Sequence, residues 1–179
     1  MMIVQIYAAT SVAEALKLVE LGVDQIGFVA GDYGEVHAEL SFDQARAIAE
    51  ALKGRAVSSA LTMSTDTDEI GRMARVVQPD IVHISSDTDA VNEGQMVDLR
   101  ERLPAGTALM KAIHVEGPAS IEVALMFAGV SDILLLDTKV SGLPGVGATG
   151  VVHDWEISRQ IVEQVSDRAK IILAGGLTP

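Results

Sequence analysis

The sequence contains no cysteine at any of its 179 positions. Disulfide bonds, thiolate metal ligands and cysteine nucleophiles are therefore all excluded. Basic residues are also scarce, since 13 Lys and Arg stand against 25 Asp and Glu and give a formal net charge of −12 at pH 7. A charge of this sign repels nucleic acid and anionic membrane surfaces, so we expect neither as a partner.

Long apolar runs are missing as well. No apolar stretch reaches the roughly 18 residues that a membrane-spanning helix requires, and the first ten residues, MMIVQIYAAT, carry no charged leader of the signal-peptide kind. We therefore expect a cytoplasmic protein. Because 49% of its residues are hydrophobic, a chain of this length can bury one core and hardly two, and we expect a single domain over residues 1–179.

Short apolar segments alternate with longer segments of helical period along the whole chain. Seven strands are predicted, at residues 3–8, 25–30, 55–62, 80–84, 108–115, 132–136 and 170–174. Six helices are predicted between them, at residues 12–21, 42–52, 67–77, 93–102, 119–128 and 154–165. Ser11 and Ser41 stand where an N-cap would bind the first free N–H groups of a helix. Gly22, Gly54 and Gly129 stand where a left-handed residue would close one.

The predicted strands are apolar at consecutive positions, as in Ile133 to Leu136, which is typical of a parallel sheet buried on both faces. Strict alternation of strand and helix indicates right-handed crossovers, in either a doubly wound sheet or a (β/α)8 TIM barrel. We favour the barrel, of which this sequence covers about seven strands. Thr178 and Pro179 resemble the start of a further helix, so we expect a closed barrel to require a further helix-strand-helix of about 40 residues.

Two glycine clusters follow predicted strands, and ligands of parallel α/β folds bind at the carboxyl ends of the strands. Gly175 and Gly176 follow the last predicted strand, where their N–H groups can approach a phosphate closely at the mouth of a helix. Gly147, Thr149 and Gly150 follow the sixth strand and add a hydroxyl group. The alternative for either cluster is that its glycines serve only turns and helix caps.

Asp137, His83 and His114 are candidate acids and bases at strand ends. Asp137 follows four apolar residues, and a carboxyl group with an apolar wall behind it favours a general acid; the alternative is a carboxylate that caps the following loop. The two histidines are candidate bases because an imidazole titrates near 6.5, although both could simply line the barrel mouth in hydrogen bonds. The four histidines show no HExxH spacing, and we expect neither a metal nor a cofactor.

Several segments together resemble phosphoribosylanthranilate isomerases. They are Gly22-Val-Asp-Gln-Ile-Gly-Phe28, Lys111-Ala-Ile-His114, Ile133-Leu-Leu-Leu-Asp137, Gly147-Ala-Thr-Gly150, His153-Asp-Trp155 and Ile171-Ile-Leu-Ala-Gly-Gly-Leu-Thr-Pro179. The resemblance implies an aldose–ketose isomerase of tryptophan biosynthesis that performs an Amadori rearrangement on a phosphorylated sugar derivative. It also implies that Asp137 opens the ribose ring as an acid and that the phosphate rests near Gly175 and Gly176.

Tyr7 occupies the position at which that family has its catalytic cysteine. A phenol titrates near 10, so its pKa would have to fall by about three units before it could act as a base at neutral pH. Nothing visible in the sequence supplies that shift. Tyr7, His83 and His114 therefore all remain candidates for the base.

The end of the site away from the phosphate departs from the family too. The family's arginine after the second strand corresponds to Ala38, and the carboxylates of Asp32, Glu35 and Glu39 in the same loop would repel an anthranilate group. Lys111 is a candidate ligand-binding residue, which could form a Schiff base or pair with Asp137. A related aldolase or epimerase, or a non-catalytic homologue that binds a phosphate ligand, therefore stays open, as does a homodimer.

Overall fold

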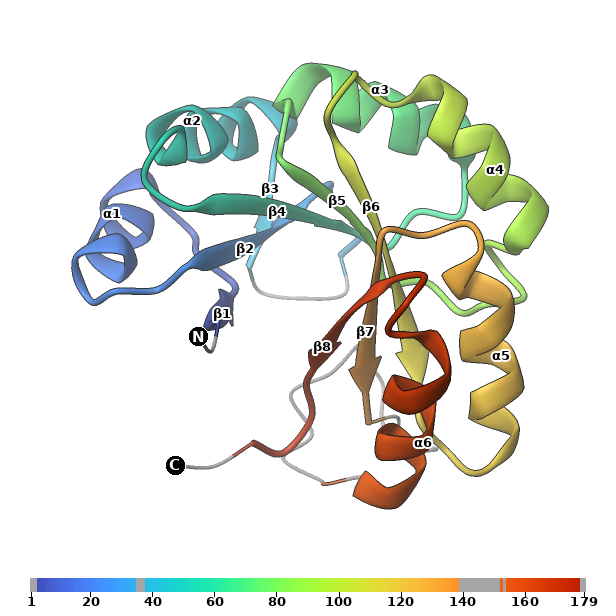
Figure 1. The fold of residues 1–179 in the computed structure, drawn as a ribbon. Helices are drawn as coiled ribbons and strands as arrows, with labels where there is room; N and C mark the ends of the chain where they lie inside the picture. The colour runs from blue at the N-terminus through green and yellow to red at the C-terminus, as the bar shows by residue number, and fades with distance from the viewer. Residues whose placement is uncertain (1–2, 35–37, 139–151, 153, 178–179) are drawn as a thin grey trace.

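The structure, a computed structural model, describes residues 3–34, 38–138, 152 and 154–177. In these ranges the chain forms one parallel sheet with helices along one of its faces (Figure 1). The strands are β1 (Gln5–Tyr7), β2 (Gln25–Ala30), β3 (Glu39–Leu40), β4 (Val57–Thr62), β5 (Ile81–Ile84), β6 (Ala108–His114), β7 (Ile133–Asp137) and β8 (Lys170–Leu173). The helices are α1 (Val12–Glu20), α2 (Phe42–Leu52), α3 (Thr67–Val77), α4 (Glu93–Arg102), α5 (Ala119–Ala128) and α6 (Trp155–Val165).

The strand order is β1-β2-β4-β5-β6-β7-β8, so strands that follow one another through a helix are also neighbours in the sheet. The predicted strands and helices are all present, with ends shifted by a few residues at most. The short strand β3, which pairs with β2, is an addition that the sequence pattern does not predict, because two residues carry no periodicity. The sheet curls rather than lying flat (Figure 1), which favours the barrel over the doubly wound alternative.

The helix caps lie where the sequence predicts them at all but one position. Ser11 and Ser41 each accept a hydrogen bond from a backbone N–H in the first turn, and Ser41 completes a capping box with Gln44. Gly22 and Gly54 are left-handed, with φ of 84° and 72°. The prediction for Gly129 is wrong: it has φ −75° and stays right-handed, because its N–H still bonds to carbonyls of the last turn of α5.

The core has two layers, one on each face of the sheet. The larger layer lies between the sheet and the helices, and Phe28, Leu109 and Ile113 belong to it. The smaller lies on the opposite face, which we call the concave face; its buried members are Ile81, Met110, Ile133 and Leu135. Because successive side chains of a strand point to opposite faces, this division assigns every strand residue to one layer or the other.

Three aspartates tie the strands together at the end of the sheet where the strands begin. The Oδ2 atom of Asp24 accepts from Val4 N at 2.8 Å, that of Asp80 from Ser58 N at 2.8 Å, and that of Asp132 from Leu109 N at 2.7 Å. The main-chain oxygen of each aspartate accepts from the strand on its other side, at Val57, Ala108 and Lys170 respectively. Each aspartate thus connects three adjacent strands. We call the opposite end of the sheet, where the strands end, the carboxyl rim.

No helix in the described ranges is both long enough and apolar enough to cross a membrane.

Asp80→Ala should lower the free energy of unfolding by about 1–3 kcal/mol, the cost of leaving a buried donor without its acceptor. Ser58 is only 2% exposed, and both its N–H and its hydroxyl donate to Asp80 Oδ2. Urea denaturation measures the change. The matched control is Asp98→Ala, at an exposed position in α4, which should change the stability by less than about 0.5 kcal/mol; equal losses for the two variants would contradict the proposed tie.

Candidate active site

Asp137 and His114 lie side by side at the carboxyl rim. They end β7 and β6, and they are register partners in the parallel ladder. By strand alternation, both side chains share the concave face with Met110 and Leu135. Each is half-buried. The structure therefore brings a carboxyl group and an imidazole from different predicted strands to one place.

The double glycine after β8 packs directly against Asp137. Gly175 and Gly176 have φ of 81° and 65°, which few other residues adopt without strain. A Cβ at Gly175 would lie 2.4 Å from Thr138 Oγ1 and 3.0 Å from Asp137 Oδ1, so a side chain has no room there. The carboxylate also accepts the Thr138 N–H at 2.7 Å. The Asp137 carboxylate thus caps the loop that follows β7, which is the alternative role that the sequence leaves open. It also borders the glycine turn.

Tyr7 reaches across the concave face instead of standing at the rim. Its ring lies over Gly27 of β2, where an added Cβ would come within 2.1 Å of the ring atom Cδ1. The hydroxyl group lies 2.8 Å from Ser59 Oγ on β4 and 2.7 Å from His83 Nδ1 on β5. The absent side chain of Gly27 is therefore what lets a residue of β1 contact a residue three strands away.

Burial governs the protonation of this cluster. Desolvation raises the pKa of the Tyr7 phenol, and the hydrogen bonds from Ser59 and Gln5 offset it only in part. Desolvation also lowers the pKa of His83 to about 3, helped by the charges of Lys111 and His114. At neutral pH the phenol is therefore protonated and the His83 imidazole is neutral, which disfavours Tyr7 as a base.

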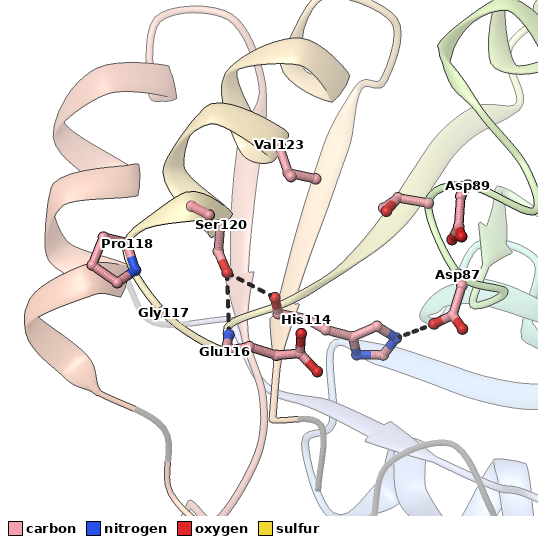
Figure 2. Close-up of a pocket in the computed structure, with 10 residues that line it drawn as sticks. Asp87, Asp89, His114, Glu116, Gly117, Pro118, Ser120 and Val123 are labelled. Atoms are coloured by element: carbon pink, nitrogen blue, oxygen red, sulfur yellow. Dashed lines mark hydrogen bonds and ion pairs between the residues drawn. The ribbon is translucent and has the colours of Figure 1, made fainter. Parts of the chain in front are cut away.

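His114 borders a hollow of about 500 Å³ between the loops that follow β5 and β6 (Figure 2). Its Nε2 lies 3.5 Å from Asp87 Oδ1, and the hollow also includes Asp89 and Glu116. Ser120 accepts from Glu116 N at 3.1 Å and donates to His114 O at 3.0 Å, which shapes the turn into α5. Asp87 and Ser120 are not among the predicted site residues. Asp87 stands three residues beyond the predicted strand at 80–84, which is a signal for a rim residue, whereas Ser120 lies within the predicted helix at 119–128.

Lys111 does not belong to this site, and its assignment as a ligand-binding residue is wrong. It alternates with Met110 on β6, so its side chain points to the helix layer, where Nζ donates to Ser86 O and lies 5.8 Å from the Phe127 ring centroid. The residue is fully buried, and desolvation lowers its pKa to about 8. Neither a Schiff base at the rim nor a pair with Asp137 is compatible with this orientation.

The acidic loop after β2 is folded partly onto itself. Glu39 Oε2 accepts from Tyr33 N and from Gly34 N, both at 2.8 Å. Tyr33 in turn bonds through its hydroxyl group to Thr62 Oγ1 at 2.7 Å and to Ala30 O at 3.0 Å. The Glu39 carboxylate, one of the three predicted to repel an anthranilate group, thus points into its own loop. Glu35 lies outside the described residues.

Gly147, Thr149 and Gly150 also lie outside the described residues, so their predicted contact with a phosphate stays a prediction. Among the residues that the structure describes, no three His, Asp or Glu side chains converge in a way that could hold a metal ion.

A curled parallel sheet with helices on its outer face, and polar residues gathered at its carboxyl rim, defines a (β/α)-barrel protein, a class in which ligands bind at the carboxyl ends of the strands. The family model described as N-(5'phosphoribosyl)anthranilate (PRA) isomerase matches residues 4–179, and the chain belongs to this family. This confirms the resemblance found in the sequence.

Individual proteins of this family are similar to the chain over most of its length. N-(5'-phosphoribosyl)anthranilate isomerase 2 of Methanosarcina mazei is 33% identical over 168 residues, which are 94% of this chain and 72% of that protein. The enzyme of Methanocella arvoryzae is 33% identical over 178 residues, 98% of this chain and 78% of that protein. Among solved structures, phosphoribosyl anthranilate isomerase from Thermus thermophilus superimposes with a TM-score of 0.76 at 25% identity, over 99% of this chain and 78% of the other. The barrel fold is thereby confirmed.

Gly27→Ala should lower the free energy of unfolding by about 1–3 kcal/mol, the usual cost of forcing a methyl group into a packed site. The new Cβ would meet the Tyr7 ring, which must leave Ser59 and His83. Denaturant midpoints measure the loss. The control is Gly117→Ala, where a Cβ meets nothing within 4 Å; if Gly27→Ala were as harmless as this control, the position of the ring would be wrong.

His83→Gln should make the free energy of unfolding depend less steeply on pH below about pH 6.5. An unfolded histidine titrates near 6.5, whereas the pKa of His83 in the folded chain is about 3, with Tyr7, Lys111 and His114 around it. Between these values the unfolded state binds more protons, so the stability falls as the pH drops, by up to about 1.4 kcal/mol per pH unit. Urea denaturation at a series of pH values measures the slope. Parallel curves for wild type and variant between pH 6 and 4 would show that His83 is not held neutral.

Proposed function

We propose that this chain is a cytoplasmic isomerase that converts N-(5'-phosphoribosyl)anthranilate into the corresponding aminoketose in tryptophan biosynthesis. The observation that carries the proposal is the contact of Asp137 with the Gly175 turn, beside His114. It combines, at one point of the carboxyl rim, an acid, a base and backbone groups suited to a phosphate. One barrel domain, a small phosphorylated ligand and no cofactor are parts of the same proposal.

Asp137 is the acid in this scheme. Its carboxyl group gives a proton to the ribose ring oxygen as the bond from that oxygen to C1 breaks, and the nitrogen lone pair forms an iminium ion with C1, the nitrogen keeping its own proton. Removal of the C2 proton then gives a neutral enolamine, which becomes the aminoketose when C1 takes up a proton and the C2 hydroxyl group loses its own. Burial of β7 on both faces supports the role, because the strand holds the carboxyl group rigidly at the rim.

His114 is the best placed base. It is the register partner of Asp137, and the carboxylate of Asp87 near Nε2 can stabilise the imidazolium that forms when the imidazole takes the C2 proton. Tyr7 is a poor base because burial raises the pKa of its phenol. His83 is a weak one because burial lowers the pKa of its imidazole to about 3.

The phosphate would rest on the N–H groups around Gly175 and Gly176, together with the segment of Gly147, Thr149 and Gly150. The left-handed conformation of the first pair supports this role, since it turns successive N–H groups toward one side. A related isomerase has been solved with reduced 1-(o-carboxyphenylamino)-1-deoxyribulose 5-phosphate, a phosphorylated ligand. The enzyme of Thermotoga maritima is described as dimeric, and we extend a homodimer to this chain.

A second function, binding of a phosphorylated ligand without turnover, is favoured by one observation. Tyr7, at the position where the resemblance places the family's base, is held by hydrogen bonds to Ser59 and His83. A scaffold that had lost its base would keep the phosphate site and the fold.

An assay of the full-length protein with N-(5'-phosphoribosyl)anthranilate distinguishes the isomerase from a protein that only binds the ligand. We expect turnover by the wild type and a loss of about 100-fold or more in kcat for Asp137→Asn and for His114→Asn, the usual contribution of a general acid or base. Binding of the reduced ligand analogue, measured by calorimetry, should persist in both variants. Asp98→Asn, at an exposed position far from the rim, is the control.

Two results would contradict the isomerase. Activity that is absent in the wild type but gained in Tyr7→Cys would identify a binding scaffold without its base. Inactivity of every variant, with no binding of the analogue, would remove the phosphoribosyl ligand altogether.

A further inference from the structure

The hydroxyl of Tyr7 joins Ser59 and His83 in a chain of hydrogen bonds on the concave face, and the Gln5 side chain also bonds to it. The hydroxyl lies 2.8 Å from Ser59 Oγ and 2.7 Å from His83 Nδ1, and the phenol and imidazole ring centroids are 5.5 Å apart. Ser59 and His83 are almost completely buried, at 0% and 3% exposure. Bulk water therefore does not compete for these bonds.

The protons of this chain can be placed by counting donors and acceptors. The phenol and the neutral imidazole carry one proton each, and so does the serine hydroxyl. If Ser59 donates to Tyr7 and Tyr7 donates to His83 Nδ1, every proton of these three groups is matched except the N–H at His83 Nε2; the hydrogen bond from Gln5 to the Tyr7 oxygen is compatible with either direction. If the direction is reversed, the Ser59 proton and the Nε2 lone pair both lack partners among the residues that the structure describes. The first direction leaves fewer buried groups unmatched, and an imidazole nitrogen is also the better acceptor for a phenol.

One donor then remains without a protein acceptor. His83 Nε2 is buried and has no hydrogen-bond partner within the described residues. Such groups are rare in folded proteins because a buried polar atom without a partner is costly. His83 alternates with Ile84 on β5 and so shares the concave face with Ile81, the face to which Asp137 and His114 also belong.

We propose that Tyr7 is a positioning residue that fixes the His83 imidazole in the tautomer with its proton on Nε2, so that His83 donates a hydrogen bond to an oxygen of the sugar ligand. Tyr7 thus occupies the position at which the resemblance places a catalytic cysteine, but it orients His83 and does not act as the base. A neutral imidazole N–H can donate to a hydroxyl oxygen of the sugar and, once the C2 hydroxyl group has lost its proton, to the ketone oxygen that remains at C2. The tautomer stands on the geometry alone, whereas the sugar oxygen as acceptor rests on the proposed function.

Nitrogen-15 NMR of the full-length protein tests the tautomer directly, because protonated and unprotonated imidazole nitrogens have well-separated shifts. The His83 signals are assigned by their loss in His83→Gln. We expect a protonated Nε2 and an unprotonated Nδ1 in the wild type, unchanged from pH 8 to pH 5. In Tyr7→Phe, which keeps the ring but removes the donor, the two tautomers should mix and Nδ1 should move.

Two further variants separate positioning from packing. Ser59→Ala removes the other partner of the phenol and should keep the Nε2–H tautomer, since Tyr7 can still donate to His83. Tyr33→Phe removes a comparable hydroxyl that bonds to Thr62 and not to His83, and it should leave the His83 signals untouched. A wild-type proton on Nδ1, or identical signals in wild type and Tyr7→Phe, would overturn the proposal.

The ligand is tested with the reduced analogue 1-(o-carboxyphenylamino)-1-deoxyribulose 5-phosphate. Binding should shift the Nε2 proton of His83, and Tyr7→Phe should weaken binding roughly tenfold, the effect of about one hydrogen bond. Binding that leaves the Nε2 signal unchanged would overturn the donor role of His83. If the analogue did not bind at all, the proposed function would fail, while the tautomer measurement would still decide the role of Tyr7.

Discussion

The parallel register of the sheet is the constraint on which the rest of this structure depends. Asp24, Asp80 and Asp132 hold it at the end where the strands begin, each through its side chain on one neighbour and its main-chain oxygen on the other. With the strands tied there, their carboxyl ends meet at one rim. The pairing of His114 with Asp137 is a direct consequence of this register.

The concave face divides the polar groups by depth. At the rim, Asp137 and His114 are half-buried. Deeper in the sheet, His83 is buried and Tyr7 is half-buried, and desolvation favours the neutral form of both groups. The Tyr7 side chain crosses Gly27 and ties β1 to β4 and β5 through its contacts with Ser59 and His83.

The elements and most of the rim residues could be predicted from the sequence for local reasons. Helical period, caps and apolar runs are encoded within about ten residues, and a polar residue directly after an apolar run marks a strand end, as it does for Asp137. Lys111 could not be placed in this way. Its neighbours on β6 are apolar on both sides, so the sequence does not show which face a given position takes, and only the register with β5 and β7 does.

The sequence by itself determined the class of fold, the family, the carboxyl group at the end of β7 and the glycine turn that follows β8, because each depends on short continuous segments of residues. Only the tertiary structure decided what the Tyr7 side chain does, because its partner His83 is 76 residues away in the chain. It also decided that Lys111 faces the helices and that Asp87 stands beside His114. These are contacts between strands, and they depend on register and curvature, which no local pattern of residues specifies.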